Sequence, residues 1–224
     1  MADVSSLFTT QEQEVFISGP DGQLQAITQL GREIADTKLD ENQFVIVCHP
    51  HPLMQGSMNN KVVHTCCRAF RDLGVKTIRF NFRGVEKSEG SYAEGIGETD
   101  DLFAVIEWCK SLNPDARFYL AGFSFGSFVA TNAAQQFTQK GFELDGLIAV
   151  APPVPRMGFA NLLPLSVRTL VVMGEEDEVV EPASVYDWCA QDPEHIQLEK
   201  VAGTTHFFHG KLTQLKSLVT DFIS

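Results

Sequence analysis

The sequence predicts an α/β protein: a mostly parallel, twisted sheet with helices on both faces and an antiparallel hairpin at its N-terminal end. From Phe44 onward, short apolar runs alternate with longer segments of helical spacing. The apolar runs are continuous, as in strands buried on both faces, and strands that alternate with helices pair in parallel. The 224 residues suit a single domain, residues 1–224, because no linker or repeat divides them.

Turn and cap residues separate the predicted elements. Gly19-Pro20-Asp21-Gly22 indicates the hairpin turn, and Asn59 or Asn60 is the expected cap of the first long helix. The stretch between Pro153 and Arg168 leaves room for a short segment at most, so no cap domain is expected over the sheet. The predicted strands are 14–18, 24–29, 44–48, 76–82, 117–122, 144–151, 169–173 and 195–201, and the predicted helices are 61–73, 99–112, 128–140, 182–190 and 211–223.

The composition indicates a globular protein with an acidic surface. A net charge of −12 and a pI near 4.8 argue against nucleic acid or an anionic membrane as a partner. This charge weakly disfavours anionic substrates, although the potential at a site need not follow the net charge. The five cysteines show no Cys-x-x-Cys spacing, which argues against a disulfide framework or a zinc site. Residues 1–6 lack the pattern of a signal peptide and no apolar run reaches the ~18 residues of a membrane span, so a cytoplasmic location is expected.

The motif that organises the chain is Gly122-Phe123-Ser124-Phe125-Gly126, a Gly-x-Ser-x-Gly sequence between an apolar strand and a helix. At such a turn, the apex residue takes a strained backbone conformation, and the glycines avoid collisions with neighbouring backbone. The serine Oγ then stands above the sheet edge, beside the N-terminus of the helix. The pattern therefore predicts Ser124 as the nucleophile of a nucleophile elbow.

A serine hydroxyl needs a neighbouring base, and the base needs a carboxylate that fixes its tautomer. His206 follows the last predicted strand, and Asp177 follows the strand before it. The carboxyl ends of parallel strands meet at one edge of the sheet, where catalytic groups gather. The order Ser124, Asp177, His206 is the order of the triad that accompanies this elbow. These three residues are the predicted catalytic triad.

Several other residues compete for these roles. His209 is an alternative base, although we expect it at the start of the last helix. The glutamates around Asp177 are expected to be solvated neighbours: Glu175, Glu176 and Glu178. Ser127 lies within the helix after the elbow and should point away from the site. The remaining acids are expected at caps or on the surface: Asp100, Asp101 and Asp145.

A tetrahedral oxyanion needs two N–H donors. The first expected donor is the backbone N–H of Phe125, directly after the nucleophile. The second should come from the loop His49–Gly56, where proline has no N–H, so the candidates are His51 and Leu53, followed by Met54. His49 and His51 are expected to anchor this loop by hydrogen bonds rather than to bind a metal. Arg83, at the end of a predicted strand, is expected to form a structural salt bridge.

Five segments together resemble a known family. They are His-Pro-His-Pro-Leu-Met-Gln-Gly-Ser-Met-Asn-Asn-Lys-Val-Val (49–63), Phe-Arg-Gly-Val (82–85), Gly-Phe-Ser-Phe-Gly (122–126), Gly-Glu-Glu-Asp-Glu-Val-Val (174–180) and Gly-Thr-Thr-His-Phe-Phe-His-Gly (203–210). They resemble the small, capless bacterial α/β-hydrolases over nearly the whole chain. The resemblance implies the α/β-hydrolase fold and a Ser124–Asp177–His206 triad in a cytosolic enzyme whose natural substrate is generally unassigned. One departure is Gln55, where the resemblance leads us to expect glycine.

These features predict a serine hydrolase that cleaves a carboxylic ester, with a small or short acyl group, through an acyl-enzyme. The short-acyl preference rests on the missing cap and on four aromatic residues near the site: Phe123, Phe125, Phe207 and Phe208. No metal or organic cofactor is required. The expected partner is a small-molecule ester, and a homodimer is left open. The alternatives are a peptidase, amidase or thioesterase with the same triad, or a silent binding protein on the same scaffold.

Overall fold

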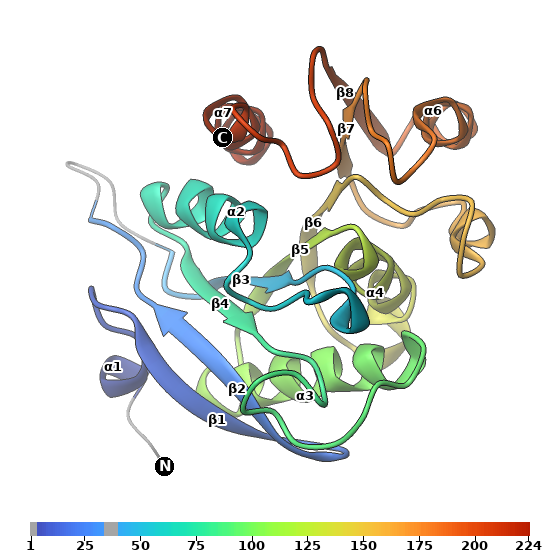
Figure 1. The fold of residues 1–224 in the computed structure, drawn as a ribbon. Coiled ribbons are helices and arrows are strands. Elements are labelled where there is room, and N and C mark those ends of the chain that lie inside the picture. The colour runs from blue at the N-terminus through green and yellow to red at the C-terminus, as the bar shows by residue number, and fades with distance from the viewer. Residues whose placement is uncertain (1–3, 34–39) are drawn as a thin grey trace.

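A computed structural model of the chain describes residues 4–33 and 40–224, which form one eight-stranded sheet with helices on both faces (Figure 1). The sheet has the strand order β1-β2-β4-β3-β5-β6-β7-β8. Its strands are β1 (Gln13–Gly19), β2 (Gly22–Gln29), β3 (Gln43–Cys48), β4 (Lys76–Phe80), β5 (Arg117–Phe123), β6 (Leu144–Val150), β7 (Thr169–Gly174) and β8 (Ile196–Val201). From β4 to β8 all neighbouring strands pair in parallel, which confirms the predicted α/β architecture.

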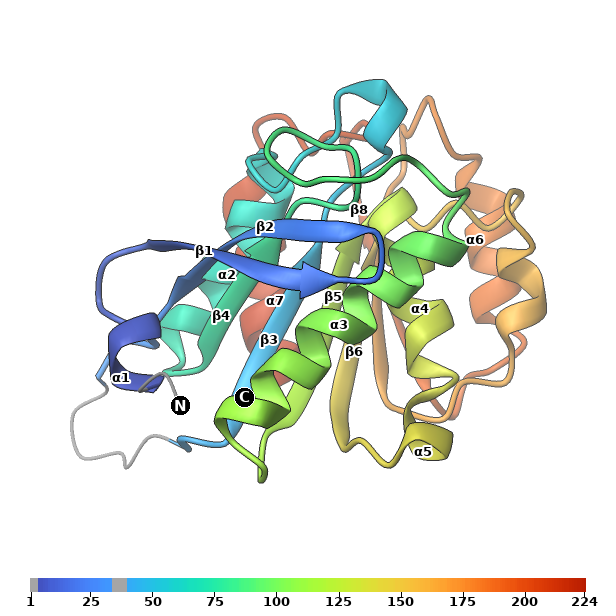
Figure 2. The same ribbon diagram turned by 90° about the horizontal axis from the view of Figure 1, so that it is seen from below.

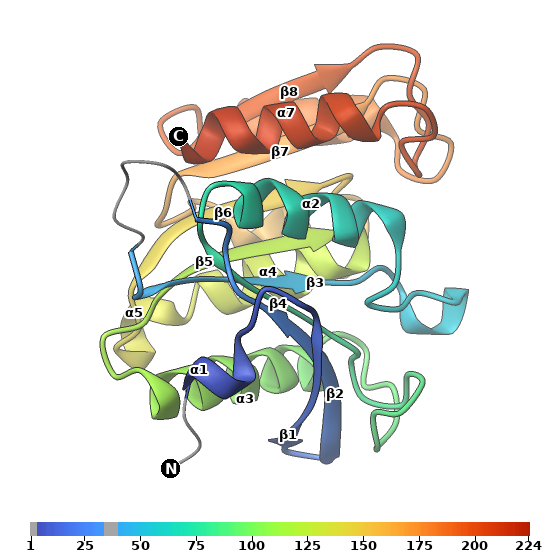
Figure 3. The same ribbon diagram turned by 90° about the vertical axis from the view of Figure 1, so that its left-hand side faces the viewer.

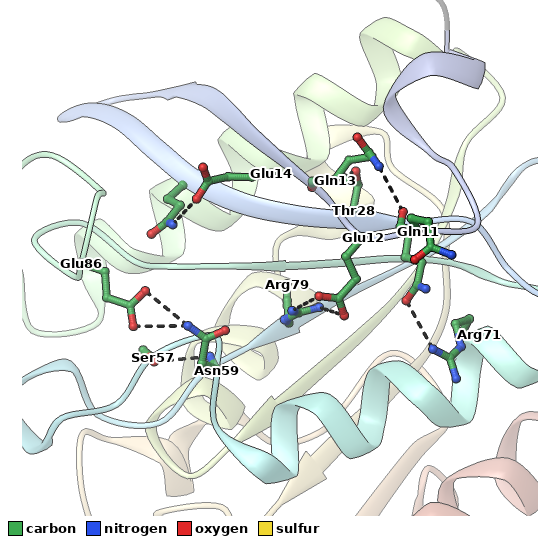
Figure 4. A network of polar contacts seen from close by, with 12 residues as sticks. Gln11, Glu12, Gln13, Glu14, Thr28, Ser57, Asn59, Arg71, Arg79 and Glu86 are labelled. Atoms are coloured by element: carbon green, nitrogen blue, oxygen red, sulfur yellow. Dashed lines mark hydrogen bonds and ion pairs between the residues drawn. The ribbon is translucent and has the colours of Figure 1, made fainter.

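The N-terminal hairpin forms the antiparallel end of the sheet. Strands β1 and β2 turn at Gly22, whose φ of +116° favours glycine, and β2 then pairs antiparallel with β4. The segment before β1 is tied to β4 by a bidentate ion pair, in which Arg79 donates to the two carboxylate oxygens of Glu12 at 3.0 and 2.8 Å (Figure 4). In the same network, Asn59 donates to the carboxylate of Glu86. The first contact holds the segment before β1 on strand β4, and the second joins the loop before α2 to the loop after β4.

The longer helices cover both faces of the sheet. Helices α2 (Lys61–Asp72) and α7 (Leu212–Ile223) pack together on one face (Figure 3), while α3 (Ile96–Leu112), α4 (Phe125–Ala134) and α6 (Pro182–Cys189) lie on the other (Figure 1). Central strands such as β3, β5 and β7 are buried almost throughout, as the continuous apolar runs predicted. The shorter helices are α1 (Val4–Leu7), α5 (Phe137–Lys140), η1 (Pro52–Met54) and η2 (Phe159–Leu162). No helix within the described ranges is long and apolar enough to span a membrane.

Three predicted boundaries were wrong for identifiable reasons. Strand β4 ends at Phe80 because the next two N–H groups leave the parallel ladder: Asn81 donates to Gln25 O, and Phe82 donates to the His49 ring. Helix α3 begins at Ile96 because the carboxylate of Glu98 accepts the N–H of Gly95 at 2.7 Å, which caps the helix earlier than expected. The predicted helix 128–140 is divided into α4 and α5, with no glycine or proline to mark the break.

The carboxyl ends of the parallel strands converge on one edge of the sheet. Figure 2 shows the loop with η1 after β3, the start of α4, and the loops after β7 and β8 gathered at this edge. The segment between β6 and β7 contains only turns and η2, and it forms no cap domain. Strand pairing therefore brings together the segments that carry Ser124, Asp177 and His206.

Candidate active site

Ser124 occupies a strained turn between β5 and α4. Its backbone has φ 52° and ψ −118°, a region that a residue with a side chain seldom adopts. The surrounding backbone holds this turn, since the Ser124 N–H donates to Val150 O at 2.8 Å. A methyl group on Gly122 would overlap the backbone of residue 126, and one on Gly126 would overlap the carbonyl oxygens of Cys48 and His49. The two glycines thus allow the close approach of three backbone segments that the elbow requires.

His206 and Asp177 form a buried hydrogen-bonded pair. The His206 Nδ1 lies 2.7 Å from Asp177 Oδ2, while Asp177 Oδ1 accepts the backbone N–H groups of Val179 and Val180 at 2.9 and 2.8 Å. Burial alone would raise the pKa of Asp177, but the hydrogen bonds from His206 and Val180 outweigh it and hold the pKa below its usual value. The ionised carboxylate therefore accepts a proton from His206 Nδ1 in a hydrogen bond, which leaves the lone pair of the neutral ring on Nε2.

Two further contacts hold His206 in place. The carboxylate of Glu178 accepts the His206 backbone N–H at 3.1 Å, and the ring of Phe123 lies with its centroid 5.0 Å from that of the His206 ring. Glu178 is exposed, as expected for a solvated neighbour, but its contact with the backbone of residue 206 was not predicted. The sequence gives no sign of this contact because it joins two loops 28 residues apart.

Ser124 and His206 line one pocket of about 530 Å³. Most of its wall is apolar, and Met54, Phe125, Met157, Val179 and Phe207 contribute to it. No hydrogen bond joins Ser124 Oγ to the His206 ring in the part of the chain that the structure describes. Such contacts between nucleophile and base are often long before substrate binds and shorten in the complex. The shared pocket brings both groups within the reach of one substrate.

The loop after β3 is held by its two histidines. His49 is fully buried; its Nδ1 donates to Pro50 O at 2.6 Å, and its Nε2 accepts the N–H of Phe82 at 3.1 Å. Because burial disfavours the charged ring, the pKa of His49 is lowered to about 3. Both ring nitrogens are occupied by these bonds, so neither has a lone pair for a metal. This agrees with the expected anchoring role.

The His51 ring is held between the loop and Tyr92. Its Nδ1 accepts the backbone N–H of Leu53 at 3.2 Å, which requires a neutral ring with its proton on Nε2. That Nε2–H donates to the hydroxyl oxygen of Tyr92 at 3.2 Å. Burial lowers the pKa of His51 although the charge of Glu98 opposes this effect, which favours the neutral form. Tyr92 was not predicted near the site because it lies 41 residues along the chain from its partner.

The same contacts distinguish the candidate oxyanion donors. The N–H of Leu53 is bonded to the His51 ring, and the N–H of Met54 donates to His51 O at 3.0 Å. Within the described residues, the backbone N–H groups of His51 and Phe125 have no acceptor, and both residues line the pocket. Leu53 does not line the pocket and its side chain points into solvent. Of the two leading alternatives for the second donor, the geometry therefore disfavours Leu53.

The comparisons with known proteins agree with this geometry. Residues 56–161 match a family model described as the alpha/beta hydrolase fold. An alpha-beta serine hydrolase homologue from Coxiella burnetii is 39% identical with a TM-score of 0.86, over 95% of this chain and 97% of its own. XC6422 from Xanthomonas campestris, a serine hydrolase without a lid, has the same identity and TM-score over 97% of this chain and 95% of its own. The chain belongs to the lidless α/β serine hydrolases. Uncharacterized protein RP471 of Rickettsia prowazekii is 31% identical over 219 residues, 94% of this chain and 88% of the relative.

The competing residues of this hydrolase lie outside the pocket. His209 is exposed, in the turn before α7, and does not line the pocket. Ser127 is buried and its Oγ donates to Ser124 O at 2.6 Å, so it points away from the site as expected. The expectation of a cap or surface position was wrong for Asp101, which is completely buried and accepts a 2.6 Å contact from Arg83 Nη2. The structural salt bridge expected of Arg83 is confirmed, and Asp101 is its partner.

One expectation about the pocket walls of this hydrolase needs revision. Phe125 and Phe207 line the pocket, but Phe123 packs beneath the His206 ring and Phe208 is completely buried elsewhere. The aromatic wall is therefore half as extensive as expected. Gln55 lines the pocket, and its backbone is in the left-handed region, with φ 62° and ψ 21°, which explains why glycine suits this position.

Proposed function

We propose that this hydrolase is a serine carboxylesterase with Ser124 as nucleophile, His206 as general base and Asp177 as the residue that orients the base. The observation that carries the proposal is the buried 2.7 Å hydrogen bond between Asp177 and His206, at a pocket that Ser124 also lines. This bond gives the imidazole the tautomer and orientation that a general base needs. The strained elbow holds the nucleophile at the same pocket.

The reaction follows from these positions. Ser124 Oγ attacks the ester carbonyl while its proton passes to His206 Nε2, and Asp177 stabilises the imidazolium. The N–H groups of Phe125 and His51 donate to the oxyanion of the tetrahedral intermediate. The C–O bond of the ester then breaks, and the imidazolium gives its proton to the leaving alcohol. Water, deprotonated by His206, attacks the acyl-enzyme in the same manner and releases the acid. No metal or organic cofactor enters these steps.

The substrate is proposed to be a small ester with a short apolar acyl group. The apolar wall formed by Met54, Met157 and Phe207 favours an apolar acyl or alkyl part. The volume of about 530 Å³ and the absence of a cap domain in the described chain favour a small molecule over a polymer. Thioesters and amides remain alternatives because the same triad acts on them. The intact serine, histidine and aspartate argue against a silent binding protein.

Covalent labelling with a fluorophosphonate tests the nucleophile directly. We expect the wild-type protein to be labelled and Ser124→Ala to remain unlabelled, while Ser127→Ala, the neighbouring serine that points away, is labelled as the wild type is. Hydrolysis of matched 4-nitrophenyl esters, thioesters and anilides of acetyl, butyryl and octanoyl groups then defines the substrate class. A wild-type protein that neither reacts with the fluorophosphonate nor cleaves any of these compounds would contradict the proposal.

A further inference from the structure

We propose that Arg156 makes this hydrolase selective for esters that carry a second, negatively charged oxygen group such as a carboxylate. The inference rests on the proposed esterase function and extends it to the class of substrate. Arg156 lies between β6 and β7, in the segment that takes the place of a cap, and lines the pocket with its neighbour Met157. Because Arg156 and Ser124 line the same pocket, a substrate held at Ser124 would lie beside this side chain.

Arg156 supplies the permanent charge of the pocket. The other residues that line it are apolar, neutral polar or histidine, and the histidines are His51 and His206. Of these histidines, His51 is held neutral by its acceptor role and by burial. A neutral ester would offer this cation no ionic partner within the pocket. An anionic group on the substrate would pair with it.

Most N–H donors of the Arg156 guanidinium have no acceptor among the described residues. Its Nη2 donates to Val179 O at 3.1 Å, and the side chain is exposed. Within the described residues, no carboxylate oxygen lies within 4.0 Å of its nitrogens. Most other arginines of this chain pair with an acid, namely Arg32, Arg71, Arg79, Arg83 and Arg117. A guanidinium carries five N–H donors in a planar fork that matches a carboxylate, so several donors stay available to a ligand.

Three acids share a second hollow with Arg156. A smaller hollow of about 300 Å³ is lined by Arg156 together with Asp177, Glu178 and Glu181. None of these acids lines the pocket of Ser124. The carboxylates of Asp177 and Glu178 are engaged with His206. Arg156 therefore lines both the substrate pocket and the hollow that holds these negative charges. Without its charge, an anionic substrate would meet their repulsion and the net charge of −12.

The local cation outweighs the acidic surface at short range. Charges farther away than the Debye length, about 8 Å at physiological ionic strength, are largely screened. A hydrogen-bonded contact with Arg156 is much closer than that and is strengthened by its charge. Because the side chain is exposed, we expect a selectivity of about threefold to tenfold rather than a larger factor. Added salt should reduce it.

Two pairs of matched esters test the inference. In the first pair, the 4-nitrophenyl monoester of hexanedioic acid replaces the terminal methyl group of 4-nitrophenyl hexanoate by a carboxylate. In the second pair, 3-carboxyphenyl acetate and 3-carbamoylphenyl acetate place the charge on the leaving alcohol. The measured quantity is the ratio of kcat/KM for the charged and the neutral member of each pair. The pair that responds identifies the side of the ester that faces Arg156.

Substitutions of Arg156 separate the effect of its positive charge from the effect of its side-chain structure. We expect Arg156→Gln to lower the ratio about threefold to tenfold in at least one pair, Arg156→Glu to lower it further and Arg156→Lys to retain part of it. Arg68→Gln is the control, because it removes the same charge from an exposed arginine of α2 outside the pocket. If Arg156→Gln leaves both ratios at the wild-type value while the esters are cleaved, the inference is wrong and the esterase proposal stands. If the wild type cleaves none of the four esters, the esterase proposal is wrong and the inference falls with it.

Discussion

His206 Nδ1 and Asp177 Oδ2 are joined by a 2.7 Å hydrogen bond. The side chain of His206 is 4% exposed and that of Asp177 is 0% exposed. The other carboxylate oxygen is fixed by two backbone N–H groups, those of Val179 and Val180. The carboxylate therefore cannot rotate without losing three hydrogen bonds. This arrangement fixes the Nδ1 side of the imidazole and leaves Nε2 free for the general-base role that we propose for His206.

Replacing the acid should disable the base while the fold is preserved. Asp177→Asn has nearly the same shape, but an amide that donates to Nδ1 would force the proton of the neutral ring onto Nε2. We expect kcat for 4-nitrophenyl butyrate to fall by about 10³- to 10⁴-fold. Glu178→Gln is the control, since its amide oxygen can still accept the His206 N–H. The role of Asp177 would be refuted if Asp177→Asn kept more than about a tenth of the wild-type kcat while its Tm was unchanged.

The second oxyanion donor can be tested through the φ angle of His51. This residue has φ −52°, which proline can adopt, so His51→Pro removes the backbone N–H with little distortion at this residue. His51→Ala removes the ring but keeps the N–H. We expect kcat for His51→Pro to be about 10²-fold below that for His51→Ala. Equal kcat values for the two variants, with similar circular dichroism and Tm, would show that the donor lies elsewhere.

The close backbone approach at the elbow predicts a strong cost for one methyl group. In Gly126→Ala, the new methyl group meets two carbonyl oxygens, those of Cys48 and His49, which cannot move without disturbing β3. We expect a loss of more than about 3 kcal/mol in the free energy of unfolding. The control Gly203→Ala has positive φ but open space around it, so it should lose about 1 kcal/mol. Urea unfolding measures both, and losses of equal size would refute the steric explanation.

The fold was predictable because burial on both faces leaves a direct trace in the sequence. The strands from Phe44 to Cys48 and from Thr169 to Met173 read as continuous apolar runs and are buried strands in the structure. The ends of elements were less predictable, since they depend on partners distant in sequence. Phe82 leaves β4 because its N–H meets the His49 ring, a contact that no local pattern reveals.

In the candidate site too, features set by a local motif were predictable, whereas contacts between residues distant in sequence were not. The position of Ser124 follows from a local motif, whose glycines report steric limits of the turn itself. The contacts of Tyr92 with His51 and of Arg83 with Asp101 join residues 41 and 18 positions apart. The sequence predicted a salt bridge for Arg83 but not its partner, and it gave no sign of the contact of Tyr92. Arg156 is a further example: the role that we propose for it depends on the apolar and neutral character of the pocket around it, which only the folded chain reveals.

The buried His49 predicts a loss of stability in mild acid. Burial lowers its pKa in the folded protein to about 3, whereas the ordinary value for an unfolded chain is about 6.5. Below pH 6.5 the unfolded chain binds a proton that the folded protein does not, so the unfolded state gains stability as the pH falls. The stability from this group is fully present above pH 6.5 and declines by about 1.4 kcal/mol per pH unit toward pH 3.

Comparison with a variant that cannot titrate isolates this effect. In His49→Gln, the amide oxygen can still accept the N–H of Phe82, but no group at this position gains a proton. Between pH 7 and pH 5, urea unfolding should show a loss of free energy in the wild type about 2 kcal/mol larger than in the variant. His51 and His64, whose pKa values burial also lowers, occur in both proteins and cancel in the difference. Parallel pH profiles for the two proteins would contradict the prediction, because they would mean that the pKa of His49 is the same in the folded and the unfolded protein.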